Sequence, residues 1–351
     1  MNIATALQTT ASLVADNDNK ITRTHTRRGR YFFVKMAILF LIVAFTGFIP
    51  SYQMMYSGQI KLHWFAHVHA AIMTSWLLVF LVQGLLAAKG NLKFHRRLGL
   101  FSVGLGALVW LAMGTASIRA RIAYPPPLED FTWDILLIEL SAMNLFGLFF
   151  TWAILVRKKA AAHKRLLFFA TLVLLQAAVD RTRWLPGLDA AFYMRFIYLD
   201  VLIMPLFIYD LVTARRIHKM TMIGSMIIII LQIAVTNTLG SPAWHQFWFN
   251  RLAPFVEQVI EVKPSDAQTE PLLGDYGDKA WHMTVSRSGG KLYLKLPDQP
   301  KFEMAATAEN EWFLRTMIWK LSFIRGADGS VIKIINKQPN ITWEAPRLKF
   351  H

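Results

Sequence analysis

Residues 63–99 read HWFAHVHAAIMTSWLLVFLVQGLLAAKGNLKFHRRLG, and this stretch decides the fold. Three histidines, His63, His67 and His69, stand at its start, and no Asp, Glu, Lys or Arg occurs before Lys89. A run of about 18 or more such residues is long enough to cross a bilayer as a helix. A basic turn and a fourth histidine, His95, follow the run. We therefore predict a membrane-spanning helix with histidines near both of its ends.

The composition favours a membrane protein over a soluble one. The chain of 351 residues is 54% hydrophobic and only 17% charged, whereas soluble domains carry about 25% charged residues. The net charge is +16, but the cations lie in short connections between apolar runs. That placement is typical of membrane topology, so we expect the lipid bilayer, and no nucleic acid, as a partner.

Seven apolar runs predict a seven-helix α-helical membrane bundle at residues 34–240. The runs cover residues 36–49, 62–88, 98–118, 131–156, 166–178, 194–212 and 222–239. Most basic connections fall on one side, which the positive-inside rule places in the cytoplasm. The basic tail, residues 1–33, is then cytoplasmic in a bacterial inner membrane. Pro50–Lys61 and a turn at Pro125-Pro126-Pro127 are outer loops, because proline breaks helices.

The last third of the chain has a different character. Residues 241–255 are rich in Trp and Phe and form an interfacial linker. Beyond them, alternating runs flank Ser288-Gly289-Gly290 and Gly326-Ala327-Asp328-Gly329. Glycine-containing turns between alternating runs predict β-hairpins. Residues 256–351 are thus expected to form a small antiparallel β-domain outside the cytoplasm, because an open sheet cannot enter lipid.

The chain contains no cysteine, which limits its chemistry. Disulfides, thiolate metal sites, iron–sulfur clusters and cysteine catalysis are excluded. Ser288-Gly-Gly-Lys291 fits a Ser-x-x-Lys motif, but it falls in a predicted hairpin turn and not at a helix start, so we interpret it as a turn. No catalytic residue is assigned. Histidines and carboxylates remain as the main candidates for metal or haem ligands.

An internal repeat marks the inner candidates. KGNLKFHRRLG, ending at Gly99, aligns without a gap with RKKAAAHKRLL, ending at Leu167, so His95 corresponds to His163. Two histidines on facing helices are what bis-histidine haem b requires. Alternatively, both bind lipid phosphates together with the cations that follow them, Arg96, Arg97, Lys164 and Arg165.

The outer candidates are histidines and carboxylates at matching predicted depth. His67 or His69 would form an outer cofactor site. His63 and His67 lie on one helix face and could bind Zn²⁺ or Fe²⁺ together with Asp134, Glu139, Asp180 and Asp200. Alternatively, these carboxylates pair with Arg181, Arg183 and Arg195. Asp210 is expected to pair with Arg215 or a loop lysine.

Two parts of the chain resemble known families. HVHA at residues 67–70, HRRLG at 95–99 and HKRLLFFATL at 163–172 resemble a group of uncharacterised bacterial multi-pass membrane proteins, over about residues 34–215. The segments LGDY at 273–276, GKLYL at 290–294 and APRL at 345–348 resemble the small β-domain that follows some β-lactamase-like serine hydrolases. The second resemblance implies a compact accessory or binding β-domain. It implies no hydrolase activity, since the hydrolase domain is absent.

Three functions are compatible with these patterns. The first is a haem b- or metal-binding protein of membrane redox chemistry, with His95 and His163 as inner ligands and a redox partner. The second is a non-enzymatic scaffold or sensor whose β-domain binds an envelope protein. The third is a membrane-embedded metal-dependent hydrolase that uses His63, His67 and the outer carboxylates. The sequence does not give the oligomeric state.

Overall fold

The computed structural model describes most of the chain. The described residues are 29–58, 60–122, 132–182, 184–188, 193–255, 260–278, 282–297, 301–315, 319–338 and 341–348. Arg183, the triple-proline turn and most of the basic tail lie outside them. The chain divides into two compact units. Unit 1 contains Met1–Phe48, Thr74–Leu108 and Asn144–Ile233, and unit 2 contains Ile49–Met73, Val109–Met143 and Ala234–His351.

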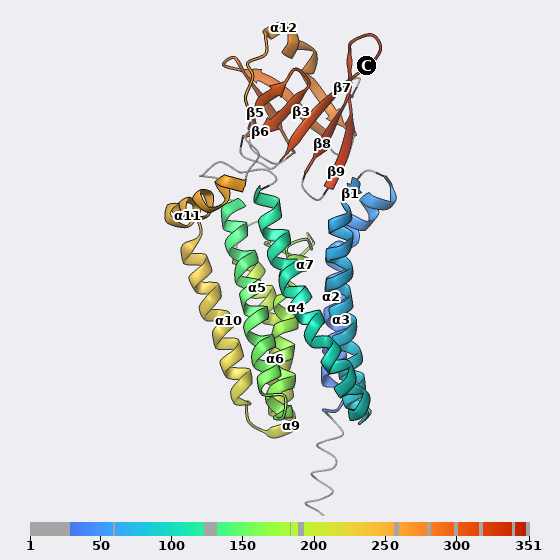
Figure 1. Ribbon diagram of the computed structural model, residues 1–351, viewed down its shortest axis with the longest axis vertical. Helices are drawn as coiled ribbons and strands as arrows, with labels where there is room; N and C mark the ends of the chain where they lie inside the picture. Colours follow the sequence, from blue (N-terminus) through green and yellow to red (C-terminus); the bar gives the residue numbers. More distant parts are fainter. Residues whose placement is uncertain are drawn as a thin grey trace, which may run out of the picture. The chain divides into compact units, whose positions relative to one another are not determined.

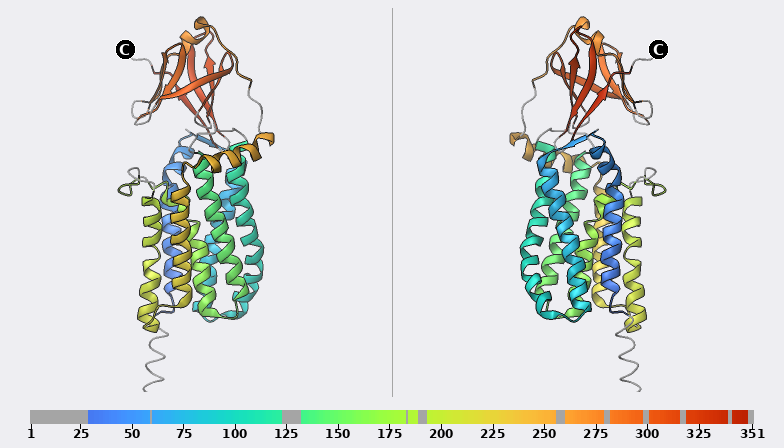
Figure 2. Two further views of the ribbon diagram at one scale, coloured as in Figure 1. Left: turned by 90° about the vertical axis from the view of Figure 1, so that its left-hand side faces the viewer. Right: turned by 90° about the vertical axis from the view of Figure 1, so that its right-hand side faces the viewer.

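Seven helical segments of the described chain are long and apolar enough to cross a membrane, as the sequence predicts. In unit 1 they lie side by side (Figures 1 and 2). Their elements are α2 (Phe32–Tyr56), α3 (Trp64–Ala88), α4 (Leu92–Ile122), α5 (Thr132–Leu155), α6 (Ala160–Val173), α7 (Gln176–Val179), α8 (Met194–Val201), α9 (Met204–Ala214) and α10 (Lys219–Thr238). The segments α6–α7 and α8–α9 each count as one span.

The turn between α3 and α4 is fixed by local sequence. Gly90 takes φ +77°, which ends α3 in the left-handed conformation that glycine favours. The Asn91 amide then bonds the carbonyl of Leu86 at 2.9 Å, and the Asn91 side chain accepts from the amide of Phe94 at 3.4 Å. Asn91 therefore caps α4. This cap places His95 in the first turn of α4.

One predicted boundary is wrong, and one predicted span is interrupted, both for identifiable reasons. The first apolar helix does not end at Ile49 but continues through Pro50 to Tyr56. Proline removes one amide donor, and the following turn keeps its own donors, so the helix persists. The sixth run is interrupted at Leu202–Ile203. Pro205 lies two residues beyond Ile203 and cannot donate an amide hydrogen to the preceding turn, which explains the interruption.

The segment α6–α7 is the most buried of the seven. In an apolar stretch of 18 residues from this segment, 72% is buried inside the protein, against 17–33% in the corresponding stretches of the other six. Phe168 and Phe169 are fully buried. On α10, a Cβ atom at Gly224 would lie 2.2 Å from the ring of Phe169, so only glycine lets α10 approach α6 this closely. A Cβ atom at Gly104 would meet nothing within 4 Å.

The C-terminal segment forms the predicted antiparallel sheet, in unit 2. The strands are β1 (Ile60–Leu62), β2 (Gly274–Gly277), β3 (His282–Ser288), β4 (Lys291–Lys295), β5 (Lys301–Ala308), β6 (Glu311–Leu314), β7 (Lys320–Arg325), β8 (Val331–Lys337) and β9 (Ile341–Pro346). Their order is β1-β9-β8-β7-β6-β5-β4-β3-β2. The turn between β3 and β4 holds Gly289 and Gly290 at φ +58° and +76°. The Ser-x-x-Lys match is therefore a hairpin turn.

Strand β1 was not predicted. It lies between α2 and α3, where the sequence suggested a loop, and pairs with β9 so that Ile60 lies opposite Trp343. Only one apolar residue stands on each side of Lys61, and an alternating pattern of three residues is too short to predict a strand. The sheet is thus completed by the connection between the first two long helices.

The sheet curls until β2 meets the end of β9. Tyr276 forms an isolated antiparallel β-bridge with Arg347, and the amide of Leu348 donates to the carbonyl of Asp275 at 2.8 Å. Arg347 also donates to the carbonyls of Pro271 and Leu273. The enclosed core consists of buried apolar side chains: Leu272, Tyr276, Met283, Val285, Leu292, Leu294, Leu296, Met304, Ala306, Trp312, Leu314, Leu321, Phe323, Val331, Ile334 and Ala345.

Two ionisable groups of the sheet have shifted pKa values. The Tyr276 hydroxyl is buried and donates to the carbonyl of Leu272 at 2.8 Å, and burial raises the pKa of Tyr276 to about 12. On the surface, hydrogen bonds from Lys291 at 3.0 Å and Arg315 at 2.9 Å hold the pKa of Glu303 below its usual range.

The segment predicted to be an interfacial linker contains a helix, α11 (Pro242–Leu252), capped by Ser241. Its His245 is buried and lies 3.0 Å from Asp134 Oδ1, and the indole of Trp244 donates to the carbonyl of Trp133 at 2.8 Å. These contacts attach α11 to the start of α5 within unit 2.

Candidate functional site

The two repeat histidines occupy equivalent positions in unit 1. His95 lies in the first turn of α4, and its Nδ1 is 3.3 Å from the carbonyl of Gln83 on α3. His163 lies in the first turn of α6, and its Nδ1 is 2.8 Å from the carbonyl of Ala153 on α5. Each histidine thus reaches back to the preceding helix. The sequence repeat is also a repeat of structure.

These contacts assign the proton on each ring. A carbonyl oxygen only accepts hydrogen bonds, so Nδ1 must carry the hydrogen in both His95 and His163. In the neutral imidazole, the lone pair is then on Nε2. Histidines that bind metals commonly donate the other ring N–H to a backbone carbonyl in this way.

His95 and His163 are both half-buried in unit 1, close enough for the charge of one to act on the other. Ligation of one cofactor by both imidazoles stays a prediction.

The outer histidines differ from one another. His69 on α3 has Nδ1 3.2 Å from the carbonyl of Ala112 on α4, so it shares the tautomer of the inner pair. His63 is exposed, and its Nδ1 accepts from the amide of Phe65 at 3.3 Å, which puts its proton on Nε2. His67 is exposed. Of the three, only His69 reaches a neighbouring helix through Nδ1.

The four outer carboxylates contact partners of their own. In unit 2, Asp134 also accepts from the amide of Gly240 at 2.8 Å, and Glu139 pairs with the buried Arg121 at 2.8 Å. In unit 1, Asp180 pairs with Arg195 at 3.2 Å, and Asp200 accepts from Gln232 at 3.1 Å. The Asp180–Arg195 pair matches the alternative interpretation of these acids.

The structure gathers no metal-binding group of three or more histidines and acids within its described ranges. His63, His67, Asp134 and Glu139 belong to unit 2, whereas Asp180 and Asp200 belong to unit 1. Metal binding by these six residues stays a prediction.

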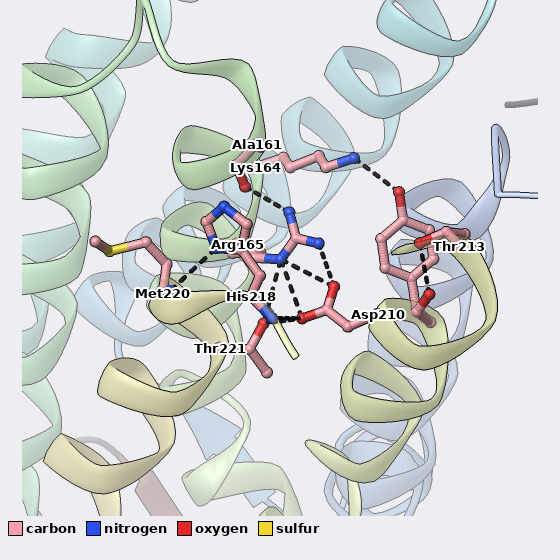
Figure 3. Close-up of polar contacts among 9 residues, drawn as sticks. Ala161, Lys164, Arg165, Asp210, Thr213, His218, Met220 and Thr221 are labelled. Atoms are coloured by element: carbon pink, nitrogen blue, oxygen red, sulfur yellow. Dashed lines mark hydrogen bonds and ion pairs between the residues drawn. The ribbon is translucent and has the colours of Figure 1, made fainter. Parts of the chain in front are cut away.

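A buried ion pair that was not predicted joins α6 to α9 in unit 1 (Figure 3). Asp210 is fully buried and Arg165 is 4% exposed. The guanidinium contacts the carboxylate through Nη2 and through Nε, the latter at 3.1 Å. The expected partners of Asp210, Arg215 or a loop lysine, were wrong, because Arg165 points inward from α6.

Further donors complete the surroundings of the Asp210 carboxylate. Thr221 Oγ1 on α10 donates to Oδ2 at 2.5 Å, and the amide of His218 donates to the same oxygen at 2.9 Å. Arg165 Nη1 also donates to the carbonyl of Ala161 at 2.6 Å. The ion pair and its hydrogen bonds therefore connect three helices, α6, α9 and α10.

Two neighbours of this ion pair are also ordered. Lys164 Nζ donates to the hydroxyl of Tyr209 at 2.7 Å. His218 Nδ1 accepts from the amide of Met220 at 3.0 Å. Burial lowers the pKa of His218, and the positive charge of Arg165 lowers it further. The neutral form of His218 is thereby favoured beside the buried pair.

The sequence contains only part of the signal for this site. An acidic residue inside an apolar span, such as Asp210, indicates a partner in the interior. The partner lies 45 residues away, and Arg165 stands among other cations, so pattern alone does not identify the pair.

Comparison with known proteins adds no family. No protein-family model matches the chain, and no curated protein matches it. Part of the chain is similar to a solved structure titled "Crystal structure of SurE", at 16% identity, over 31% of this chain and 27% of that chain, with a TM-score of 0.20. The match spans about a quarter of that protein, and so low a TM-score supports no argument about fold or function.

Proposed function

We propose that this chain is a bacterial inner-membrane protein that binds haem b or a metal ion between His95 and His163 and takes part in membrane redox chemistry. One observation carries the proposal: both Nδ1 hydrogens are given to backbone carbonyls, which leaves Nε2 of each neighbouring imidazole with a lone pair for a metal.

The exposed apolar surface supports insertion into a bilayer. In six of the seven spans, most of the apolar stretch is not buried inside the protein. Leu100 and Ile230, for example, are 79% and 61% exposed. In the proposed topology, the N-terminus is cytoplasmic and the β-domain extracytoplasmic. The cations of three connections support that orientation: Lys89, Lys93, Arg96, Arg97, Arg157, Lys158, Lys159, Arg215 and Arg216.

The proposed cofactor suits the residues at the inner site. Haem b, when bound, supplies one-electron chemistry, and imidazoles are common haem ligands. The carbonyls of Gln83 and Ala153 hold the two rings in their tautomers. The side-chain Oε1 of Gln83 is buried without a hydrogen-bond partner in the described structure, so this part of the site contains an acceptor available to an additional polar group.

The test is a visible spectrum of the detergent-purified protein, oxidised and reduced, with iron and zinc analysis on the same sample. We expect an absorption band that shifts on reduction and is lost in His95→Ala and in His163→Ala. His282→Ala, at an exposed position of the sheet, is the matched control and should keep the band. A folded protein without haem, iron or zinc would refute the proposal.

A second candidate is a membrane scaffold or sensor whose β-domain binds an envelope protein. The observation that favours it is the pairing of β1 with β9, because a ligand that strains the sheet would act on the connection between α2 and α3. This function predicts that partner binding is lost on removal of residues 256–351 and kept in His95→Ala. The reverse pattern would argue against it.

A further inference from the structure

The internal repeat uses its two cations differently in its two copies. Arg96 and Arg97 align with Lys164 and Arg165. In the second copy, Lys164 contacts Tyr209 and Arg165 is buried against Asp210. In the first copy, both arginines are exposed, and no ion pair joins either of them to a carboxylate of the described chain. The first copy therefore exposes both cations, whereas the second copy pairs Arg165 with a carboxylate and hydrogen-bonds Lys164 to a tyrosine.

The chain around the first copy offers no acid to neutralise them. Residues 19–128 contain no Asp or Glu. Instead, two further exposed cations lie close in the chain to Arg96 and Arg97: Lys89 in the turn between α3 and α4, and Lys93 in the first turn of α4. The Nε atom of Arg30, at the start of α2, donates to the carbonyl of Ala88 and brings a fifth exposed cation to the same turn.

Large apolar side chains lie beside these cations and are also exposed. Leu92 and Phe94 precede the two arginines, and Leu100 and Phe101 follow them, each at least half exposed. The guanidinium of Arg97 lies over the ring of Phe94, 5.9 Å from its centroid. A soluble anion would satisfy only the cations, whereas a phospholipid offers a phosphate to the cations and acyl chains to the apolar residues.

We infer that the start of α4, next to the turn between α3 and α4, binds the headgroup of an anionic phospholipid at a defined site, through Lys93, Arg96 and Arg97. The equivalent positions at the start of α6 form no such site, because Lys164 and Arg165 are engaged within the protein. This inference rests on the proposed membrane insertion and is independent of cofactor binding by His95 and His163.

The experiment measures lipid binding by native mass spectrometry of the full-length protein in a neutral detergent. Phosphatidylglycerol and phosphatidylcholine are titrated separately. The test variant is Lys93→Gln/Arg96→Gln/Arg97→Gln. The matched control is Arg157→Gln/Lys158→Gln/Lys159→Gln, which removes the same charge from the α5–α6 connection, where all three cations are also exposed.

We expect wild-type protein to prefer phosphatidylglycerol. Each cation that contacts the headgroup contributes on the order of fivefold, so the test variant should lose affinity about a hundredfold, while the control, whose cations lie outside the site, stays within about twofold. Equal losses in both variants would show a general effect of charge and overturn the inference, as would an unchanged test variant.

Two further measurements separate lost charge from lost folding, and lipid binding from cofactor binding. The charge-conserving variant Arg96→Lys/Arg97→Lys should retain lipid binding, which separates lost charge from lost folding; loss of binding in it would contradict a headgroup site that recognises charge. The visible spectrum on the same samples reports the cofactor separately. Lipid binding without a cofactor would refute only the redox proposal, and a cofactor without selective lipid binding would refute only this inference.

Discussion

Replacing Asp210 with asparagine removes the charge that compensates Arg165 inside unit 1. The carboxylate accepts from two guanidinium nitrogens, from Thr221 Oγ1 and from the amide of His218, and Arg165 is only 4% exposed. Breaking a buried pair from one side leaves an uncompensated charge and typically costs about 3–5 kcal/mol. We expect Asp210→Asn to lower the free energy of unfolding by that amount.

The assay is reversible unfolding by sodium dodecyl sulfate in mixed micelles, followed by circular dichroism. Asp200→Asn is the matched control, because Asp200 is half-buried and its hydrogen bond to Gln232 is the contact at stake. Its cost should be about 1 kcal/mol. The double variant Arg165→Met/Asp210→Leu removes both charges and should be more stable than Asp210→Asn, since apolar replacement of a buried pair is often neutral.

Two results would refute this reasoning. An Asp210→Asn variant that loses no more stability than Asp200→Asn would show that the carboxylate is not needed to compensate Arg165. The double variant can also be compared with Arg165→Met and Asp210→Leu alone. If its loss of unfolding free energy equals the sum of the losses of these two variants, Arg165 and Asp210 do not interact energetically.

Three further predictions concern pH and packing. The lowered pKa of Glu303 contributes stability that is present above its unfolded value of 4.5 and is lost as the pH falls through the folded value; acid unfolding should show this loss, and Glu303→Gln should abolish it. The pKa of Tyr276 is raised to about 12, so the sheet should lose stability as the pH rises from 10 towards 12, and absorbance titration of the phenol can follow this. Tyr276→Phe should lower the free energy of unfolding by about 1–3 kcal/mol, because it leaves the carbonyl of Leu272 unpaired. Gly224→Ala should destabilise unit 1 by about 1–3 kcal/mol through overpacking, whereas Gly104→Ala should stabilise it by about 0.5–1 kcal/mol through helix propensity, both measured by the same detergent unfolding; equal effects would contradict the packing geometry.

Much of the fold could be predicted because local sequence patterns determine its helices and hairpins. Long apolar runs with few charges identified all seven long helices, and glycine turns such as Gly289-Gly290 identified the hairpins of the sheet. These signals are local, and the physics behind them is local too: an apolar run of sufficient length, and a backbone conformation that glycine adopts readily.

The rest depended on contacts between distant residues. Nothing near Asp210 indicates that Arg165 is its partner, and nothing near Ile60 indicates that it joins a sheet made by the end of the chain. The repeat did predict that His95 and His163 are equivalent, because aligned residues in repeated hairpins occupy the same turn. Their carbonyl partners, Gln83 and Ala153, follow from helix packing, which the alignment does not describe.

The pairing of β1 with β9 also sets an order of assembly. About 280 residues separate Ile60 from Trp343, so this is a contact of very long range, of the kind that closes late in folding. During synthesis, the connection between α2 and α3 emerges long before its partner strand exists, and the edge of β9 can be covered only after all seven helices have been made. A chain truncated before residue 341 would therefore carry β1 without its partner strand.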